Sequence, residues 1–319
     1  MNDFLALKVL IKRNIKLYMR DRMTVFFSVL APLIILLIYI LFLGNLQVDM
    51  ITEAVGEGTI ARADVQALIN NWMIAGVMGV SCITCSINTN IVMVRDRANG
   101  NLNDMLSSPV KKWVIFASYV ISCFLLTLCI CAIVLAVSLV YLAIVGGFYL
   151  SFVDILAIIG ITLLSIISSA SFTAFISMFI KSVNSLAALN GILSTAVGFL
   201  IGAYLPFAML PSVMQYIACF VPGTYSVGLY KDYFLRGILA HIENTAINPS
   251  VIEEIRQQYS LQLDFFGHQV NTGHMVLALI ISIAVFVSLI AIFYSKRKAN
   301  FFSVSKKVVQ KFKSKHKHS

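Results

Sequence analysis

The side chains best placed for chemistry lie in a short charged stretch, RDRANGNLNDMLSSPVKK, which runs from Arg95 to Lys112 between two long apolar segments. It opens with the charged residues Arg95, Asp96 and Arg97 and continues through Asn99 and Gly100. A simple connector needs only a few polar residues, whereas this stretch carries signals for a helix of its own. Its chemistry is that of recognition, because charged groups beside a short helix can bind a partner.

The helix signals begin at Asn101, a favourable N-cap, and Asp104 three residues later suits the positive end of a helix. Pro109 ends the helix. Three apolar residues spaced i, i+3 and i+4 share one face: Leu102, Met105 and Leu106. A helix this short is marginal in water unless something covers its apolar face. The lipid surface, the protein's own helix ends and a separate cytoplasmic subunit are all candidates for that cover.

Catalytic signals are scarce in the rest of the sequence. Cys82 and Cys85 form a C-x-x-C pair, but in an apolar segment without basic neighbours, which favours a packing role. The chain contains no G-x-x-x-x-G-K-[ST] phosphate loop, and the middles of its apolar segments contain no acid or base. We therefore expect no catalytic, metal or cofactor site here. If the protein transports actively, its energy enters from another chain.

The composition predicts an all-α integral membrane protein, because 59% of the residues are hydrophobic and only 12% are charged. Each of six apolar segments approaches the ~20 residues that a bilayer requires. We place these spans at 24–43, 71–94, 113–144, 153–180, 185–205 and 274–295. The net charge of +10 does not indicate nucleic acid, because the charges lie mainly beside the spans.

The basic residues also predict a topology in the cell (plasma) membrane. All but four of the 24 Lys and Arg residues fall on one side of the predicted spans, the exceptions being Arg62, Lys231, Arg236 and Arg256. Because cytoplasmic segments are enriched in Lys and Arg, both termini and the Arg95 stretch are expected in the cytoplasm. An even number of spans agrees with this orientation.

Residues 1–23 predict an amphipathic helix in the membrane interface. Its apolar stripe consists of Phe4, Leu7, Ile11, Ile15 and Tyr18. Its cations lie beside the stripe at Lys8, Lys12, Lys16 and Arg20. We expect the stripe to enter the inner headgroup layer and the cations to meet anionic lipid.

We interpret the chain as one transmembrane domain over 1–319, with spans one to five in 24–205 and span six in 274–295. Two hydrophilic outer loops are predicted, at about 44–70 and 231–273. Residues 212–221, SVMQYIACFV, are too short to span, and prolines 206, 211 and 222 bracket them. Region 206–273 is therefore read as a re-entrant segment and outer loop, and 296–319 as a basic cytoplasmic tail. Gly198 and Gly202 form a G-x-x-x-G pair that weakly suggests self-association.

This pattern resembles the permease subunit of ABC-2 type exporters, close to the multidrug and antibiotic-efflux branch, over nearly the whole chain. The family's loop after the second span reads roughly E-R-x-x-G-T-L-E-x-L-x-x-x-P. The matching positions here are Asp96, Arg97, Gly100, Asn101, Leu102, Asn103, Met105 or Leu106, and Pro109. The segment VPGTYSVGLYKDYFLRG before the last span is also similar to the family's re-entrant region. Asp96, Asn101 and Asn103 depart from the family's usual Glu, Thr and acid.

The resemblance implies a passive membrane subunit that moves a small amphiphilic or lipid-like compound outward. A cytoplasmic ABC subunit would bind ATP and Mg²⁺, and a second permease chain, identical or different, would complete the transporter. The stretch from Asn99 to Leu106 would be a coupling helix seated on the ATPase. Polysaccharide or teichoic-acid export, a secondary carrier, and a membrane anchor without transport are the alternatives.

Overall fold

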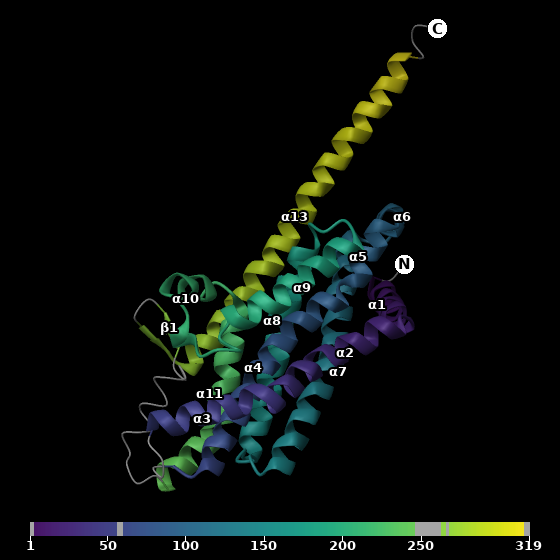
Figure 1. The fold of residues 1–319 in the computed structure, drawn as a ribbon. Helices are drawn as coiled ribbons and strands as arrows, with labels where there is room; N and C mark the ends of the chain where they lie inside the picture. The colour runs from purple at the N-terminus through teal and green to yellow at the C-terminus, as the bar shows by residue number, and fades with distance from the viewer. Residues whose placement is uncertain (1–2, 56–59, 246–262, 266–267, 316–319) are drawn as a thin grey trace.

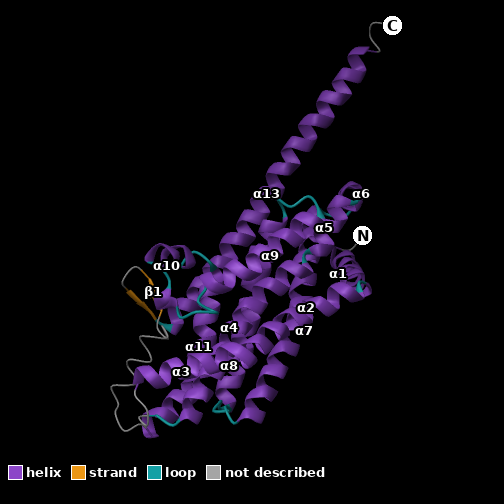
Figure 2. Cartoon of the chain, in the orientation of Figure 1, coloured by secondary structure: helices purple, strands orange, loops and turns teal. Residues whose placement is uncertain are grey.

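The computed structural model describes residues 3–55, 60–245, 263–265 and 268–315, and nearly all of them are helical (Figure 1 and Figure 2). The first half contains α1 (Asp3–Arg20), α2 (Arg22–Ile38), α3 (Gly44–Val55), α4 (Arg62–Thr89), α5 (Ile91–Ala98), α6 (Asn101–Ser107) and α7 (Lys112–Val145). The second half contains α8 (Phe152–Ser177), α9 (Val183–Leu200), α10 (Ser212–Ala218), α11 (Pro222–Thr245) and α13 (Thr272–Lys315). The short elements are a π-helical segment η1 (Tyr39–Leu43), a 3₁₀ turn η2 (Phe207–Met209) and an antiparallel hairpin of β1 (Leu263–Phe265) and β2 (His268–Val270).

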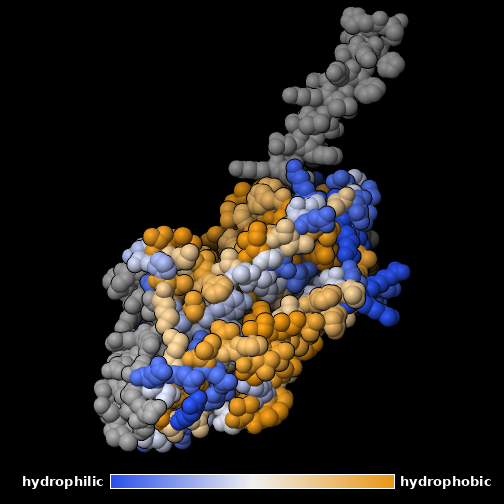
Figure 3. All heavy atoms as spheres, viewed as in Figure 1, coloured by the Kyte–Doolittle hydropathy of each residue, from blue (hydrophilic) through white to orange (hydrophobic). Residues whose placement is uncertain are grey.

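Among the described residues, six helical stretches are long and apolar enough to cross a membrane. They are Arg22–Glu53, Arg62–Ala98, Lys112–Val145, Phe152–Ser177, Val183–Leu200 and Thr272–Phe293. The predicted all-α integral membrane fold with six spans is therefore confirmed. Apolar residues dominate the middle of the visible face, with hydrophilic residues gathered toward both ends (Figure 3).

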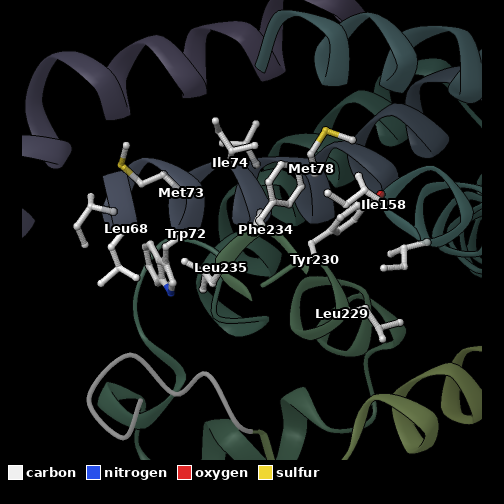
Figure 4. Close-up of a cluster of buried hydrophobic side chains, with 14 of the residues drawn as sticks. Leu68, Trp72, Met73, Ile74, Met78, Ile158, Leu229, Tyr230, Phe234 and Leu235 are labelled. Carbon is white, nitrogen blue, oxygen red and sulfur yellow. The ribbon is translucent and has the colours of Figure 1, made fainter. Parts of the chain in front are cut away.

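Helix α4 forms the centre of the bundle and packs against α2, α7, α8, α9 and α11. It is buried on all sides, so its apolar residues recur without a polar face, as expected of a helix surrounded by others. Its core partners lie on α11, where Tyr230 and Phe234 pack near Trp72 and Met78 (Figure 4). Gly76 and Gly79 allow other segments of the same chain to approach α4 closely. A Cβ at Gly76, for example, would collide with the Ala203 carbonyl.

The predicted outer loop at 44–70 is wrong, because most of it is helical. Helix α2 continues through η1 into α3, and α4 already begins at Arg62. Val48 and Ile51 are buried against the α4 core, while Asp49 and Glu53 on α3 remain exposed. The acidic residues therefore mark the outer face of a packed helix rather than a loop.

The predicted outer loop at 231–273 is also wrong over its first third. Helix α11 continues to Thr245, and its apolar residues at helical spacing are buried, among them Phe234, Ile238 and Ile242. Helix α11 runs antiparallel to α4: Gly223 lies beside Ile83, and His241 lies 3.5 Å from Asp64. Its first residues therefore lie deep along α4, as a re-entrant half-helix would. Residues 246–262 lie outside the described part of the chain.

The first seven residues of the short apolar piece at 212–221 form α10, on which Val213 and Ile217 are exposed, and Phe220 after the helix is exposed as well. The aromatic residues around it divide between two environments: Phe207 and Tyr230 are buried in the core, whereas Tyr216 is exposed. These aromatic residues therefore do not share one environment.

The predicted G-x-x-x-G contact between chains does not fit the structure. A Cβ at Gly198 would collide with the ring of Tyr204 in the same chain, and Gly202 adopts a positive φ of 70° where the chain leaves α9. Only glycine adopts that backbone conformation readily. Both glycines therefore allow the chain to turn at the end of α9.

Helix α13 continues well beyond the sixth span to Lys315, so the predicted tail from 296 begins as a helix, and residues 316–319 lie outside the described part. The N-terminus, α1 and α6 lie at one end of the bundle, and α3 lies toward the other (Figure 1). We call these the α6 end and the α3 end. The charged stretch from Arg95 to Lys112 is at the α6 end.

Candidate functional site

The charged stretch folds as two short helices joined by a tight turn. Helix α5 ends at Ala98, and Gly100 adopts a left-handed φ of 83° immediately before α6. The prediction that Asn101 caps α6 is wrong, because Gly100 takes the capping position and Asn101 is the first helical residue. The Asn101 side chain instead donates a hydrogen bond to Asp96 at 3.2 Å. The turn therefore folds α6 back onto the last turn of α5.

Asp96 is the centre of a polar network that joins four helices. Its carboxylate is 3% exposed and accepts two hydrogen bonds from the Arg13 guanidinium, at 2.7 and 2.8 Å. The Tyr119 hydroxyl donates a third at 2.6 Å, and Asn101 donates the fourth. A bidentate Arg–carboxylate pair fixes both position and orientation. The network therefore locks α1, α5, α6 and α7 together beneath the exposed turn.

Arg13 is a site residue that sequence reasoning missed. In the sequence it is only one of several basic residues in the N-terminal segment. In the structure, its hydrogen bonds with Asp96 raise the pKa of its guanidinium above the ordinary value. The neighbouring Asn14 is 1% exposed and donates to Ser118 on α7 at 3.3 Å. The sequence contains one signal that this part of α1 contacts the protein interior. Asn14 is a polar residue within the apolar stripe between Ile11 and Tyr18, which is typical of a residue with a buried hydrogen-bond partner.

Arg97 connects the same turn to α8. Its guanidinium donates to three backbone carbonyls at the end of that helix, those of Ser177, Met178 and Ile180, at 3.1, 2.6 and 2.8 Å. The last carbonyls of a helix have no partner within the helix and carry partial negative charge, so a cation there is stabilising. Movement of the α5–α6 turn must therefore move or release the end of α8.

Two exposed ion pairs complete the connections at the α6 end. Arg95 lies 2.8 Å from Asp21, which also caps α2 by accepting from the Thr24 N–H. The hydrogen bond from Arg95 holds the pKa of Asp21 below its usual range. Lys111 lies 2.6 Å from Asp3 at the start of α1. Exposed pairs of this kind contribute only about 0–1 kcal/mol each, so the buried Asp96 network dominates.

The apolar face of α6 is covered by the protein's own helix ends. Leu102 is 3% exposed and packs in a cluster with Tyr18, Met93 and Phe116, and Met105 and Leu106 are partly buried against this cluster. The chain itself therefore covers Leu102 fully and Met105 and Leu106 in part. Apart from Ala98 and Pro109, the exposed residues around the turn are polar, namely Asn99, Asn101, Asn103, Asp104 and Ser107.

The N-terminal helix α1 lies along α7 at this end of the molecule. Its predicted stripe turns largely toward the protein: Tyr18 is 2% exposed, and Leu7, Ile11 and Ile15 are partly buried, whereas Phe4 is exposed. The expectation that the whole stripe enters lipid is therefore corrected. The four predicted cations, Lys8, Lys12, Lys16 and Arg20, are exposed on the outer side of α1.

A second unforeseen residue lies deep in the bundle. Lys231, which the sequence placed in an outer loop, is 4% exposed on α11. Its ammonium donates to the Gly202 carbonyl at 2.8 Å and lies 4.5 Å from the centre of the Trp72 ring. A buried cation needs such compensation. Lys231 thereby ties α11 to the break after α9.

The geometry defines a multi-pass membrane protein with a charged, helix-joining turn at one end. The family model for ABC-2 type transporters matches residues 5–235, and the chain belongs to this family. Such a chain is the transmembrane subunit of an ABC exporter, and the family typically works with a separate ATP-binding subunit. No curated protein is similar enough to count as a match.

Proposed function

We propose that the α5–α6 turn is the coupling site of this exporter subunit and that its outward polar face binds a cytoplasmic ABC ATP-binding subunit. The observation that carries the proposal is the division of α6 into two faces. Leu102 and the Asp96 network anchor its inner face, while Asn103 and Asp104 remain exposed. An exposed helix fixed so firmly from within can pass an applied force to the helices behind it.

Charge supports a cytoplasmic position for the α6 end. Helix α1 and most of the basic residues lie at this end, α13 extends beyond it to Lys315, and cytoplasmic segments are enriched in Lys and Arg. ATP and Mg²⁺ are then bound by the partner, since this chain has no phosphate loop. Closure of the ATPase would push α6, and the contacts of Asp96 and Arg97 would carry the displacement to α1, α7 and α8.

The membrane path is proposed to lie between two permease chains. Helix α9 leaves a face of small residues uncovered, in which Ala187, Gly191 and Thr195 are exposed at intervals of four. Small residues at such intervals allow membrane helices to approach closely. A second permease chain seated there would enclose a path beside largely apolar helices. This arrangement suits a small amphiphilic or lipid-like compound, such as a drug, antibiotic or peptide, as cargo.

The coupling proposal is tested by reversing one charge on the outward face of α6. We expect Asp104→Lys to lower ATP turnover of the complex reconstituted with its ATPase by about tenfold, because a lost or repulsive interfacial contact weakens docking by roughly that factor. The variant should insert and fold normally, since Asp104 is exposed and makes no contact with the Asp96 network.

Glu53→Lys is the matched control. Glu53 is an exposed acid on α3, toward the opposite end of the molecule, so the same charge reversal there should leave turnover unchanged. Copurification of the ATPase with each variant separates loss of docking from loss of later steps. Normal docking and normal turnover for Asp104→Lys would refute the assignment of this face.

A further inference from the structure

An apolar groove runs along the outside of the bundle at the α6 end, between the first turns of α7 and the last apolar turns of α13. Its volume is about 810 Å³. Its lining includes Leu106 on α6 and Val110 in the α6–α7 connection. Helix α7 contributes Phe116 and Ala117, and α13 contributes Val287 and Ile290. None of the network residues around Asp96 lines the groove, and it meets the coupling helix only at Leu106, near the end of α6.

The dimensions of the groove match one leaflet of a bilayer. Its α7 wall extends from Lys112 to Ile121. At a helical rise of 1.5 Å per residue, this wall is about 14 Å long. Half of the ~30 Å hydrocarbon core of a bilayer is about the same length. A single acyl chain lying along α7 would therefore fill the groove from the interface toward the middle of the membrane.

The polar groups of the groove gather at one end of it. Lys111 and Lys112 line the end next to the α6–α7 connection, and Trp113 beside them is 57% exposed. Tryptophan favours the depth of the headgroups. Lys111 also contacts Asp3 at 2.6 Å, and its side chain remains 63% exposed, so a second anion can reach its ammonium.

We propose that this groove binds one anionic phospholipid of the inner leaflet, with an acyl chain against Phe116, Ala117 and Val287 and the phosphate at Lys111 and Lys112. The apolar length and the cationic end are complementary to the two parts of such a lipid. A cationic or zwitterionic headgroup lacks the net charge that the lysines favour. The lipid would touch Leu106 and Ser108, so it would also support the C-terminal end of α6. This site stands independently of the proposed coupling function.

The tryptophans provide a direct test. The chain has two: Trp113 lines the groove, whereas Trp72 is 1% exposed in the core. The full-length protein would be reconstituted in phosphatidylcholine vesicles containing either brominated phosphatidylglycerol or brominated phosphatidylcholine at equal mole fraction. Bromine quenches tryptophan on contact, and a Trp113→Phe sample gives the Trp72 background. We expect phosphatidylglycerol to occupy the groove about five- to tenfold more strongly, as one or two lysines near an anionic headgroup would produce.

Two variants, each with a control, test which residues cause the preference for phosphatidylglycerol. Ala117→Phe fills the groove and should remove the selective quenching, whereas Ala132→Phe, an exposed alanine farther along α7, should leave it intact. Lys112→Gln should reduce the preference severalfold, and Lys181→Gln, an exposed lysine between α8 and α9, should not. Equal quenching by the two lipids would overturn the proposal. Failure of both lipids to quench Trp113 would also overturn the proposal, because it would show that protein covers the groove.

Discussion

At the residue scale, the deciding group is Asp96, a buried carboxylate held by an arginine 83 positions earlier in the chain. Removing one partner of a buried, hydrogen-bonded ion pair leaves the other charge uncompensated, which costs about 3–5 kcal/mol when both are fully buried. Arg13 is 32% exposed, so water relieves part of that cost. We expect Asp96→Asn to lower the free energy of unfolding by about 2 kcal/mol, measured by denaturation in detergent.

The same substitution in an exposed pair is the control. Asp49 and Arg62 lie 2.7 Å apart, with side chains 54% and 70% exposed. Asp49→Asn should therefore change stability by less than about 1 kcal/mol. Equal effects of the two substitutions would show that the Asp96 network contributes no more than a surface ion pair, and would contradict its role in joining α1 to α5, α6 and α7.

Sequence reasoning identified Asp96 and Arg97 but not what they contact. The charged pattern beside a span is a local signal, whereas Arg13, Tyr119 and the end of α8 reach these residues only through the fold. Packing of Leu102 against the chain itself was likewise one of three alternatives for the cover of the apolar face of α6. Helical spacing shows that residues share a face, but not what that face contacts. The N-cap was misplaced by one residue, because Gly100 adopts a left-handed conformation in the capping position and Asn101 becomes the first helical residue.

At the element scale, stability depends on how closely α4 meets its neighbours. Gly76 on α4 lies against the backbone of Ala203, and a Cβ there would collide with the Ala203 carbonyl. Backbone cannot rotate away as a side chain can, so α4 and the segment after α9 must move apart. We expect Gly76→Ala to destabilise the protein by about 1–3 kcal/mol, the usual cost of overpacking, in thermal denaturation monitored by helical circular dichroism.

Gly160→Ala on α8 provides the comparison, because a Cβ there meets nothing within 4 Å. In that helix alanine should be neutral or slightly stabilising, by up to about 1 kcal/mol. Identical melting of the two variants and the parent would mean that α4 and the chain after α9 are not in close contact.

The elements were predicted unevenly, for a physical reason. Long apolar runs flanked by charge gave the six spans, because bilayer thickness fixes their length. Helix α3 and the part of α11 from Lys231 onward were read as loops, because charges were taken as evidence of solvent. Asp49 does face solvent, but it lies on the outer side of a helix whose Val48 and Ile51 are buried. Lys231 shows the opposite case: a charge that is buried because a carbonyl and an aromatic ring replace its water.

At the scale of the whole molecule, the spans differ greatly in how much of their surface the chain itself covers. Helix α4 is enclosed, whereas α9 exposes the small residues Ala187, Gly191 and Thr195 on one face. Among the residues that the structure describes, none comes within 4 Å of a Cβ placed at Gly191. Gly191 therefore has no packing role within one subunit, and we propose that its role is close approach to α9 of a second copy.

This proposal makes the last prediction. Gly191→Leu should weaken association between permease chains by about tenfold, because a large side chain separates helices that small residues bring together. The measurement is energy transfer between two fluorescently labelled populations in vesicles, as a function of protein-to-lipid ratio. Gly160→Leu is the matched control, since Gly160 is equally open on a different span, and it should leave association unchanged. The proposal fails if both variants associate like the parent, or if Gly160→Leu disrupts association and Gly191→Leu does not. In the latter case α8, rather than α9, would carry the contact between chains.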